Sequence, residues 1–254
     1  MADFVSKDSI VRRIWGKGDT ILFIFAGASA EFALNKAVDW LYYTGRLPAD
    51  PLGRLFSTVS YARLIVFSEY NEAVYAIDKI TAIHTDVEDK RGSKIPDWAY
   101  RDVLFMLIDY SIRSFEALER KLTEDEKTEV FDVFNRVGQR MRLKGLPLNY
   151  NEWLIMRSEH IQSNLICSSF TKDLYKQYRH HLGLIRFLLL KQAQILVVPT
   201  RVNTLLSLGN IPYLYPVLKL YKLARVFKLE GYLKNAILPS EYKKQIRNLD
   251  SITI

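Results

Sequence analysis

Apolar residues recur along this chain at intervals of three and four positions. In the segment TEDEKTEVFDVFNRVGQRMRLKG (123–145) they fall on one face, made of Val130, Val133, Phe134, Val137 and Met141. This spacing is typical of an amphipathic α-helix, because 3.6 residues make one turn. Thr123 and Glu126 stand at the two positions of a capping box. The basic residues before Gly145 predict the end of the helix there.

The same period predicts helices at 50–67, 70–87, 98–122, 168–192 and 216–227. We find no alternating run bounded by Asn-Gly or Asp-Gly turns, as a β-hairpin would require. The glycines and prolines fall mostly between the helical segments, and the chain has no internal repeat and no linker. A chain of 254 residues that is 49% hydrophobic can bury one sizeable core. We therefore predict an all-α fold in which residues 1–254 form a single compact multi-helix domain.

The positive charge is concentrated in the last third of the chain. Residues 172–254 hold 14 Lys/Arg and 4 Asp/Glu, a balance of +10, whereas the preceding residues hold 22 and 24, a balance of −2. Such a basic segment can face a membrane surface, phosphates or an acidic ligand, or it can be a solvated helical surface. The stretch YPVLKLYKLARVFKLEGYLK (215–234) has the composition of an interfacial helix.

Several classes of site are excluded by the sequence. Cys167 is the single cysteine, so an internal disulfide and a cysteine-based zinc site are both excluded. The segment GKGDT (16–20) lacks the Lys-Ser/Thr of a phosphate loop, and we find neither a nucleophile elbow nor an HExxH motif. The N-terminal residues lack the apolar core of a secretory signal, and no apolar run reaches the length of a membrane span. We expect a cytoplasmic protein that binds no nucleic acid, with peripheral membrane contact through residues 172–254.

His84 is one of four histidines and occupies the apolar face of a predicted helix. Ile80, Ile77 and Ala73 precede it by four, seven and eleven residues and share that face. A neutral imidazole there needs a partner for each ring nitrogen. Two interpretations are open: a metal or haem iron binds Nε2, or the histidine bonds to a backbone carbonyl and a water in the core.

A polar stripe marks the helix predicted at 50–67. Arg54 and Thr58 are four residues apart and Tyr61 follows three later, so the three share one face. The opposite face carries Leu52, Leu55, Val59 and Ala62. Arg54 can pair with a buried carboxylate or polarise a bound oxygen species, or the stripe can simply face solvent.

Taken in order, five segments resemble a known family. They are 16–34 (GKGDTILFIFAGASAEFAL), 50–68 (DPLGRLFSTVSYARLIVFS), 83–92 (IHTDVEDKRG), 96–111 (PDWAYRDVLFMLIDYS) and 123–153. The series is similar to the haem-dependent oxygenases that include the latex-clearing rubber oxygenases and the MpaB-type oxygenase of mycophenolic acid biosynthesis. The likeness covers roughly 14–208. It implies an all-helical domain that encloses a pocket for haem b and oxidises a small apolar organic substrate with dioxygen.

Four positions carry the family's site residues over to this chain. His84 matches the proximal iron ligand, while Arg54 and Thr58 match the arginine and threonine of the distal helix, where they would stabilise bound dioxygen. Ser57 stands where rubber oxygenases can carry a lysine that closes the distal side of the iron. A serine is too short to do so, which implies an open or water-bound sixth position.

One position departs from the family pattern. Many members read W-V-H where this chain reads Trp98-Ala99-Tyr100. Tyrosine can itself ligate ferric haem, so Tyr100 is the second candidate for the axial ligand. We expect the absence of this histidine to affect oxygenase activity more than haem binding.

Other roles implied by the resemblance stay open. The haem propionates would take cations from the basic last third, where Arg186, Lys191 and Arg201 are candidates, and Glu31 or Asp39 would be a base. Two further classes of function also remain. One is a haem-binding protein without oxygenase turnover. The other is a cofactor-free basic helical protein that docks on membranes or partners.

Overall fold

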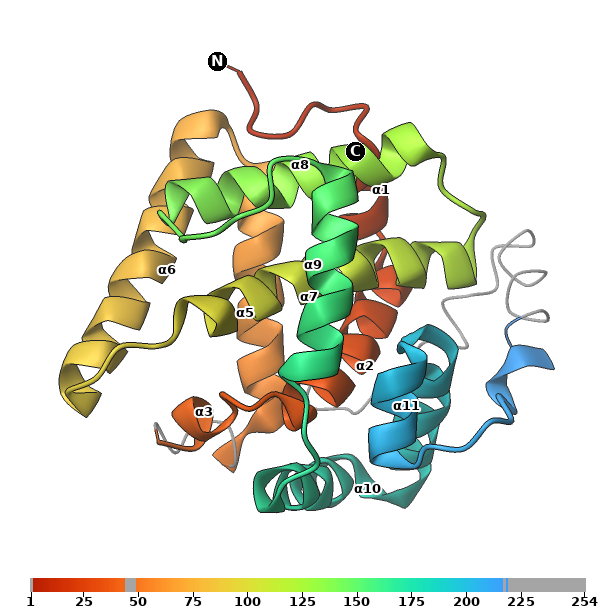
Figure 1. Cartoon of the computed structure of the whole chain (residues 1–254). Coiled ribbons are helices and arrows are strands. Elements are labelled where there is room, and N and C mark those ends of the chain that lie inside the picture. The colour runs from red at the N-terminus through yellow and green to blue at the C-terminus, as the bar shows by residue number, and fades with distance from the viewer. Residues whose placement is uncertain (1, 44–48, 217, 219–254) are drawn as a thin grey trace.

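The computed structural model describes residues 2–43, 49–216 and 218, which fold almost entirely into helices (Figure 1). In chain order the helices are α1 (Ile10–Trp15), α2 (Gly18–Leu34), α3 (Asp39–Tyr43), α5 (Pro51–Phe67), α6 (Tyr70–Arg91), α7 (Asp97–Leu118), α8 (Glu124–Arg140), α9 (Tyr150–Ser163), α10 (Ser169–Val197) and α11 (Thr200–Leu206). No strand occurs in these described ranges, where β pairing is limited to the isolated bridges Asp3–Glu69 and Asn35–Leu165. The predicted all-α fold is confirmed.

Helices α2 and α7 form the centre of the molecule. Helix α2 packs against α7 on one side and against α10 on another. The crossing of α2 and α7 is close at Gly27, where an added Cβ would lie 2.2 Å from Cδ1 of the buried Tyr110. A glycine at this point lets the two helices approach, because any larger residue would meet the tyrosine ring.

The predicted helices at 50–67, 70–87, 98–122 and 123–145 are confirmed as α5, α6, α7 and α8. The capping box of α8 is present, and Val130, Val133, Phe134 and Val137 are buried as predicted. The predicted end of this helix was wrong, because α8 ends at Arg140 rather than near Gly145. Arg142 and Gly145 both have left-handed backbones, with φ of 57° and 67°, so the chain turns twice after the helix ends.

Helix α10 differs from its prediction in shape. The sequence predicts one continuous helix at 168–192, whereas Gly183 adopts φ 71° and ψ 171° and divides α10 into two halves. A left-handed φ is accessible to glycine without a Cβ clash, which explains the residue at the kink. The helix predicted at 216–227 and the interfacial stretch at 215–234 lie almost wholly outside the described residues.

Three distant helices are joined inside the core by one arginine. Arg157 of α9 donates from Nη1 and Nη2 to the carboxylate of Glu31 in α2, at 2.5 and 2.6 Å. It also donates from Nε to Asp109 of α7 at 3.0 Å. Tyr110 donates to Glu31 at 2.7 Å, and Arg113 donates to Asp109 at 2.6 Å. All the charges of this buried cluster therefore have partners of opposite sign.

Candidate functional site

The candidate site lies on the hairpin formed by α5 and α6, which pack against each other and are joined by a two-residue turn. In an antiparallel hairpin of helices, residues equally far from the turn lie at the same height, because each residue rises 1.5 Å. Arg54 is 13 residues before Phe67, and His84 is 14 residues after Tyr70. Arg54 and His84 are therefore at similar distances from the turn, near the far ends of the two helices, where Figure 1 shows α5 and α6 diverging.

His84 sits where the inward face of α6 becomes partly accessible. Ala73 and Ile77 of that face are fully buried, as the sequence predicts, whereas Ile80 and His84 are half-buried. The imidazole meets the ring of Tyr100 from α7 edge-on, with the ring centroids 5.2 Å apart and the planes at 67°. Two of the predicted site residues are thus in direct contact.

Tyr100 is held in place by Glu88, one turn beyond His84 on α6. The Tyr100 hydroxyl donates to Glu88 Oε1 at 3.0 Å, and the same carboxylate accepts from the backbone N–H of Ile95 at 2.9 Å and from Lys94 Nζ at 2.8 Å. Burial alone would raise the pKa of Glu88, but these three donors outweigh it and lower that pKa. Burial and the hydrogen bond to Glu88 both raise the pKa of Tyr100. The Tyr100 phenol therefore stays protonated, and its ring stays in contact with the imidazole of His84.

On α5, the predicted distal residues differ in exposure. Ser57 is exposed and Thr58 is half-buried, while Val59 and Ala62 are buried on the opposite face as the sequence predicts. The backbone of Arg54 is helical, but its side chain lies outside the described part of the structure, as do those of Leu52 and Leu55.

Both candidate bases already face an arginine. Asp39 of α3 accepts from Arg91 at the end of α6 at 2.8 Å, and Arg91 also stacks on Trp40 with its guanidinium carbon 3.9 Å from the ring centroid. This contact fixes α3 to the His84 end of α6. Glu31 is buried in its ion pair with Arg157. The sequence did not reveal that pair, although a glutamate inside the apolar run TILFIFAGASAEFAL signals a missing partner.

The proposed propionate cations lie on helices from the last third of the chain. Arg186 and Lys191 are half-buried on α10, which packs against α5 of the hairpin as well as against α2 and α7. Arg201 is exposed on α11, which packs against α2 and α9. Of the three, the two on α10 belong to a helix that contacts the hairpin.

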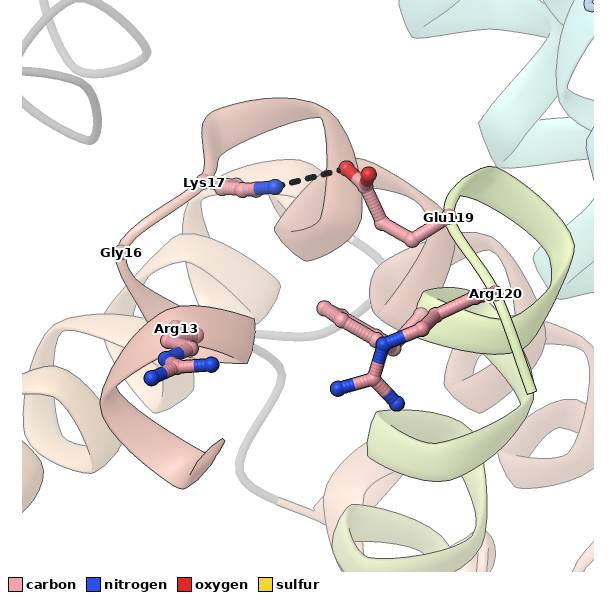
Figure 2. Close-up of a pocket in the computed structure, with 6 residues that line it drawn as sticks. Arg13, Gly16, Lys17, Glu119 and Arg120 are labelled. Atoms are coloured by element: carbon pink, nitrogen blue, oxygen red, sulfur yellow. Dashed lines mark hydrogen bonds and ion pairs between the residues drawn. The ribbon is translucent and has the colours of Figure 1, made fainter. Parts of the chain in front are cut away.

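A surface pocket of about 390 Å³ lies elsewhere, where α1 meets α2 (Figure 2). Its lining residues are Arg13, Gly16, Lys17, Phe115, Glu119 and Arg120. Lys17 pairs with Glu119 at 2.8 Å, and Arg120 pairs with Glu126 at 2.6 Å. Phe115 is 15 residues beyond Tyr100 on α7, or about 22 Å along the helix axis. This pocket is therefore separate from the His84 site.

Comparison with known proteins decides the family. Residues 12–220 match the family described as "ER-bound oxygenase mpaB/B'/Rubber oxygenase, catalytic domain". The chain belongs to this oxygenase family. The match includes all of the 14–208 segment in which the sequence resembles the family, and membership supports an oxygenase-type function. No curated protein and no solved structure matched the chain.

The described residues contain neither a cluster of metal ligands nor a membrane-spanning helix. Within 2–43, 49–216 and 218, no three His, Cys, Asp or Glu side chains are grouped so that they could hold a metal ion. None of the helices in this part of the chain is long and apolar enough to span a membrane.

Proposed function

We propose that this member of the oxygenase family binds haem b through His84 and oxidises a small apolar organic substrate with dioxygen. The observation that carries the proposal is a half-buried imidazole on α6, in edge-on contact with Tyr100, in a chain that belongs to this oxygenase family. Haem needs only one ligand from the protein, because the porphyrin supplies four nitrogens to the iron and a single histidine can supply the next.

The surroundings of His84 fit a porphyrin. Ile80 and Val87, about one turn away on either side, are half-buried apolar residues that can contact a largely apolar macrocycle. Tyr100 is the weaker ligand candidate, because ligation requires a phenolate and the pKa of its hydroxyl is raised by burial and by Glu88. Its contact with His84 instead favours the role of a positioning residue for the imidazole.

Haem, when bound, would supply the redox chemistry with dioxygen, and the chain would supply orientation and electrostatics. Arg54 and Thr58 lie one turn apart on α5 and would offer hydrogen bonds to dioxygen. The bond from a guanidinium is the stronger of the two, because it is charge-assisted. Ser57 is exposed, and its short side chain would not reach the iron as the lysine of rubber oxygenases can.

The cofactor proposal is tested by the absorption spectrum and haem content of the purified protein. We expect a Soret band in the wild type, loss of most haem in His84→Ala with unchanged helical circular dichroism, and haem retention in Tyr100→Phe. The matched control is His180→Ala, which removes an exposed imidazole on α10. Full haem content in His84→Ala, or a colourless wild type, would overturn the proposal.

The oxygenase proposal is tested by oxygen uptake per bound haem. Arg54→Leu should keep its haem and lose about 10²–10³ in rate, the usual effect of removing one preorganised donor. Thr58→Val should lose less, because a neutral hydrogen bond is weaker than a charged one. Unchanged uptake per haem in Arg54→Leu would remove its catalytic role. Haem binding without any substrate-dependent uptake would instead identify a haem protein without turnover.

A further inference from the structure

The second half of α10 presents apolar side chains to solvent. Leu184, Ile185 and Leu188 directly follow the kink at Gly183 and are 56%, 76% and 52% exposed. Positions 184, 185 and 188 lie on one side of a helix. In Figure 1, α10 begins at the lower edge of the molecule, on the opposite side from α8, and its second half rises behind α11.

A second apolar segment continues this face. The backbone N–H of Leu214 donates to Oε1 of Gln192 at 3.4 Å, which places the segment 211–215 beside α10. Gln192 lies one turn beyond Leu188 and two turns beyond Ile185, on the same side of the helix. Ile211, Tyr213 and Tyr215 are 60%, 68% and 53% exposed. We call the six exposed side chains the α10 apolar patch: Leu184, Ile185, Leu188, Ile211, Tyr213 and Tyr215.

The segment of sequence that carries the patch contains basic residues and no acidic ones. Residues 174–218 contain five basic residues and no Asp or Glu, over 45 consecutive positions. The basic residues are Lys176, Arg179, Arg186, Lys191 and Arg201. A second copy of this chain would bring like charges face to face across the patch, which is unfavourable. An anionic surface is the complementary partner.

We propose that the α10 apolar patch docks on an anionic lipid bilayer. Leucine and isoleucine side chains would enter the boundary between headgroups and acyl chains, while the two tyrosines would lie at headgroup level, where an aromatic ring with a polar tip is favoured. The flanking lysines and arginines would attract anionic headgroups, so that apolar burial and charge act together. The proposal is independent of haem binding at His84.

Sedimentation of the full-length protein with phosphatidylcholine vesicles, with and without phosphatidylserine, tests the proposal. We expect binding to the phosphatidylserine vesicles that weakens as salt is raised, because the charge attraction is screened. The double variant Ile185→Ser/Leu188→Ser should reduce the vesicle partition coefficient by at least about tenfold, because burying one such side chain is worth roughly that factor. The matched control is Leu154→Ser/Ile155→Ser, which changes side chains of α9 that are 45% and 63% exposed and should leave binding unchanged.

Each other outcome contradicts the proposal. Absence of vesicle binding at low salt would show that the patch does not meet lipid. Equal loss of binding in the α9 and α10 variants would show that the patch is not the docking face. A concentration-dependent dimer of the wild type, abolished by the α10 variant and accompanied by no vesicle binding, would assign the patch to a second copy of the chain. Circular dichroism of both variants shows that they fold.

Discussion

Replacing Arg157 by methionine tests the buried ion cluster between α2, α7 and α9. The Arg157 side chain is 5% exposed and faces the carboxylates of Glu31 and Asp109, which are 2% and 10% exposed. Arg157→Met would leave Glu31 with the Tyr110 hydroxyl and Asp109 with Arg113, but without the central cation. Removing one partner of a buried pair costs about 3–5 kcal/mol, because a charge is left buried and uncompensated. For a chain of this size that is a fall in Tm of about 6–20 °C.

The assay is chemical and thermal denaturation of Arg157→Met beside a matched control, Arg120→Met. Arg120 also pairs with a carboxylate, that of Glu126, but its side chain is 51% exposed, so its loss should cost far less stability than the loss of Arg157. The pKa of Asp109 would rise with burial, but Arg157 and Arg113 lower it. The ionised Asp109 carboxylate stabilises the folded protein above the pKa that it has in the unfolded chain, and this stabilisation is lost as the pH falls. The difference in free energy of unfolding between Arg157→Met and the wild type should therefore become smaller in acid. An Arg157→Met protein as stable as Arg120→Met would refute the reasoning.

Two further variants test local packing and capping. Gly27→Ala should lower the free energy of unfolding by about 1–3 kcal/mol, because its Cβ would clash with the ring of Tyr110; a higher denaturation midpoint would contradict this. Glu126→Gln should cost up to about 1 kcal/mol near neutral pH, because the amide oxygen can still accept from the Thr123 N–H but the negative charge at the start of α8, which pairs with Arg120, is lost. The hydrogen bond from Arg120 holds the pKa of Glu126 at about 2, below its usual 4.5, so this stability is present above pH 4.5 and lost as the pH falls toward 2. The Tm difference from the wild type should therefore close near pH 2, and a constant difference across that range would show that the charge is not involved.

The sequence predicted best those elements whose signals are local. The apolar spacing of α8 and its capping box, Thr123 and Glu126, both lie within one short segment, the 17 residues of the helix and its N-cap. Both could therefore be recognised in the sequence alone. The face of α6 was also predictable, because Ala73 and Ile77 repeat at the helical period. The end of α8 was not, because it depends on left-handed residues rather than on apolar spacing.

Contacts between distant segments escaped prediction. Glu31 and Arg157 are separated by 126 positions, and no spacing rule connects them. Similarly, Asp102 of α7 accepts from Asn35 at 2.8 Å and from Asn164 at 3.1 Å, which joins three segments that are far apart in the chain. The sequence singled out both His84 and Tyr100 as candidate site residues. It did not predict that their rings touch, because that contact depends on how α7 crosses α6.

The central claim, that His84 ligates haem, is tested most directly by the variant His84→Gly titrated with imidazole. A glycine leaves room for a free imidazole to take the place of the lost side chain. We predict that His84→Gly loses most of its haem and that added imidazole restores both the haem content and the absorption spectrum of the wild type. A His84→Gly protein that retains the wild-type spectrum without imidazole would contradict the claim.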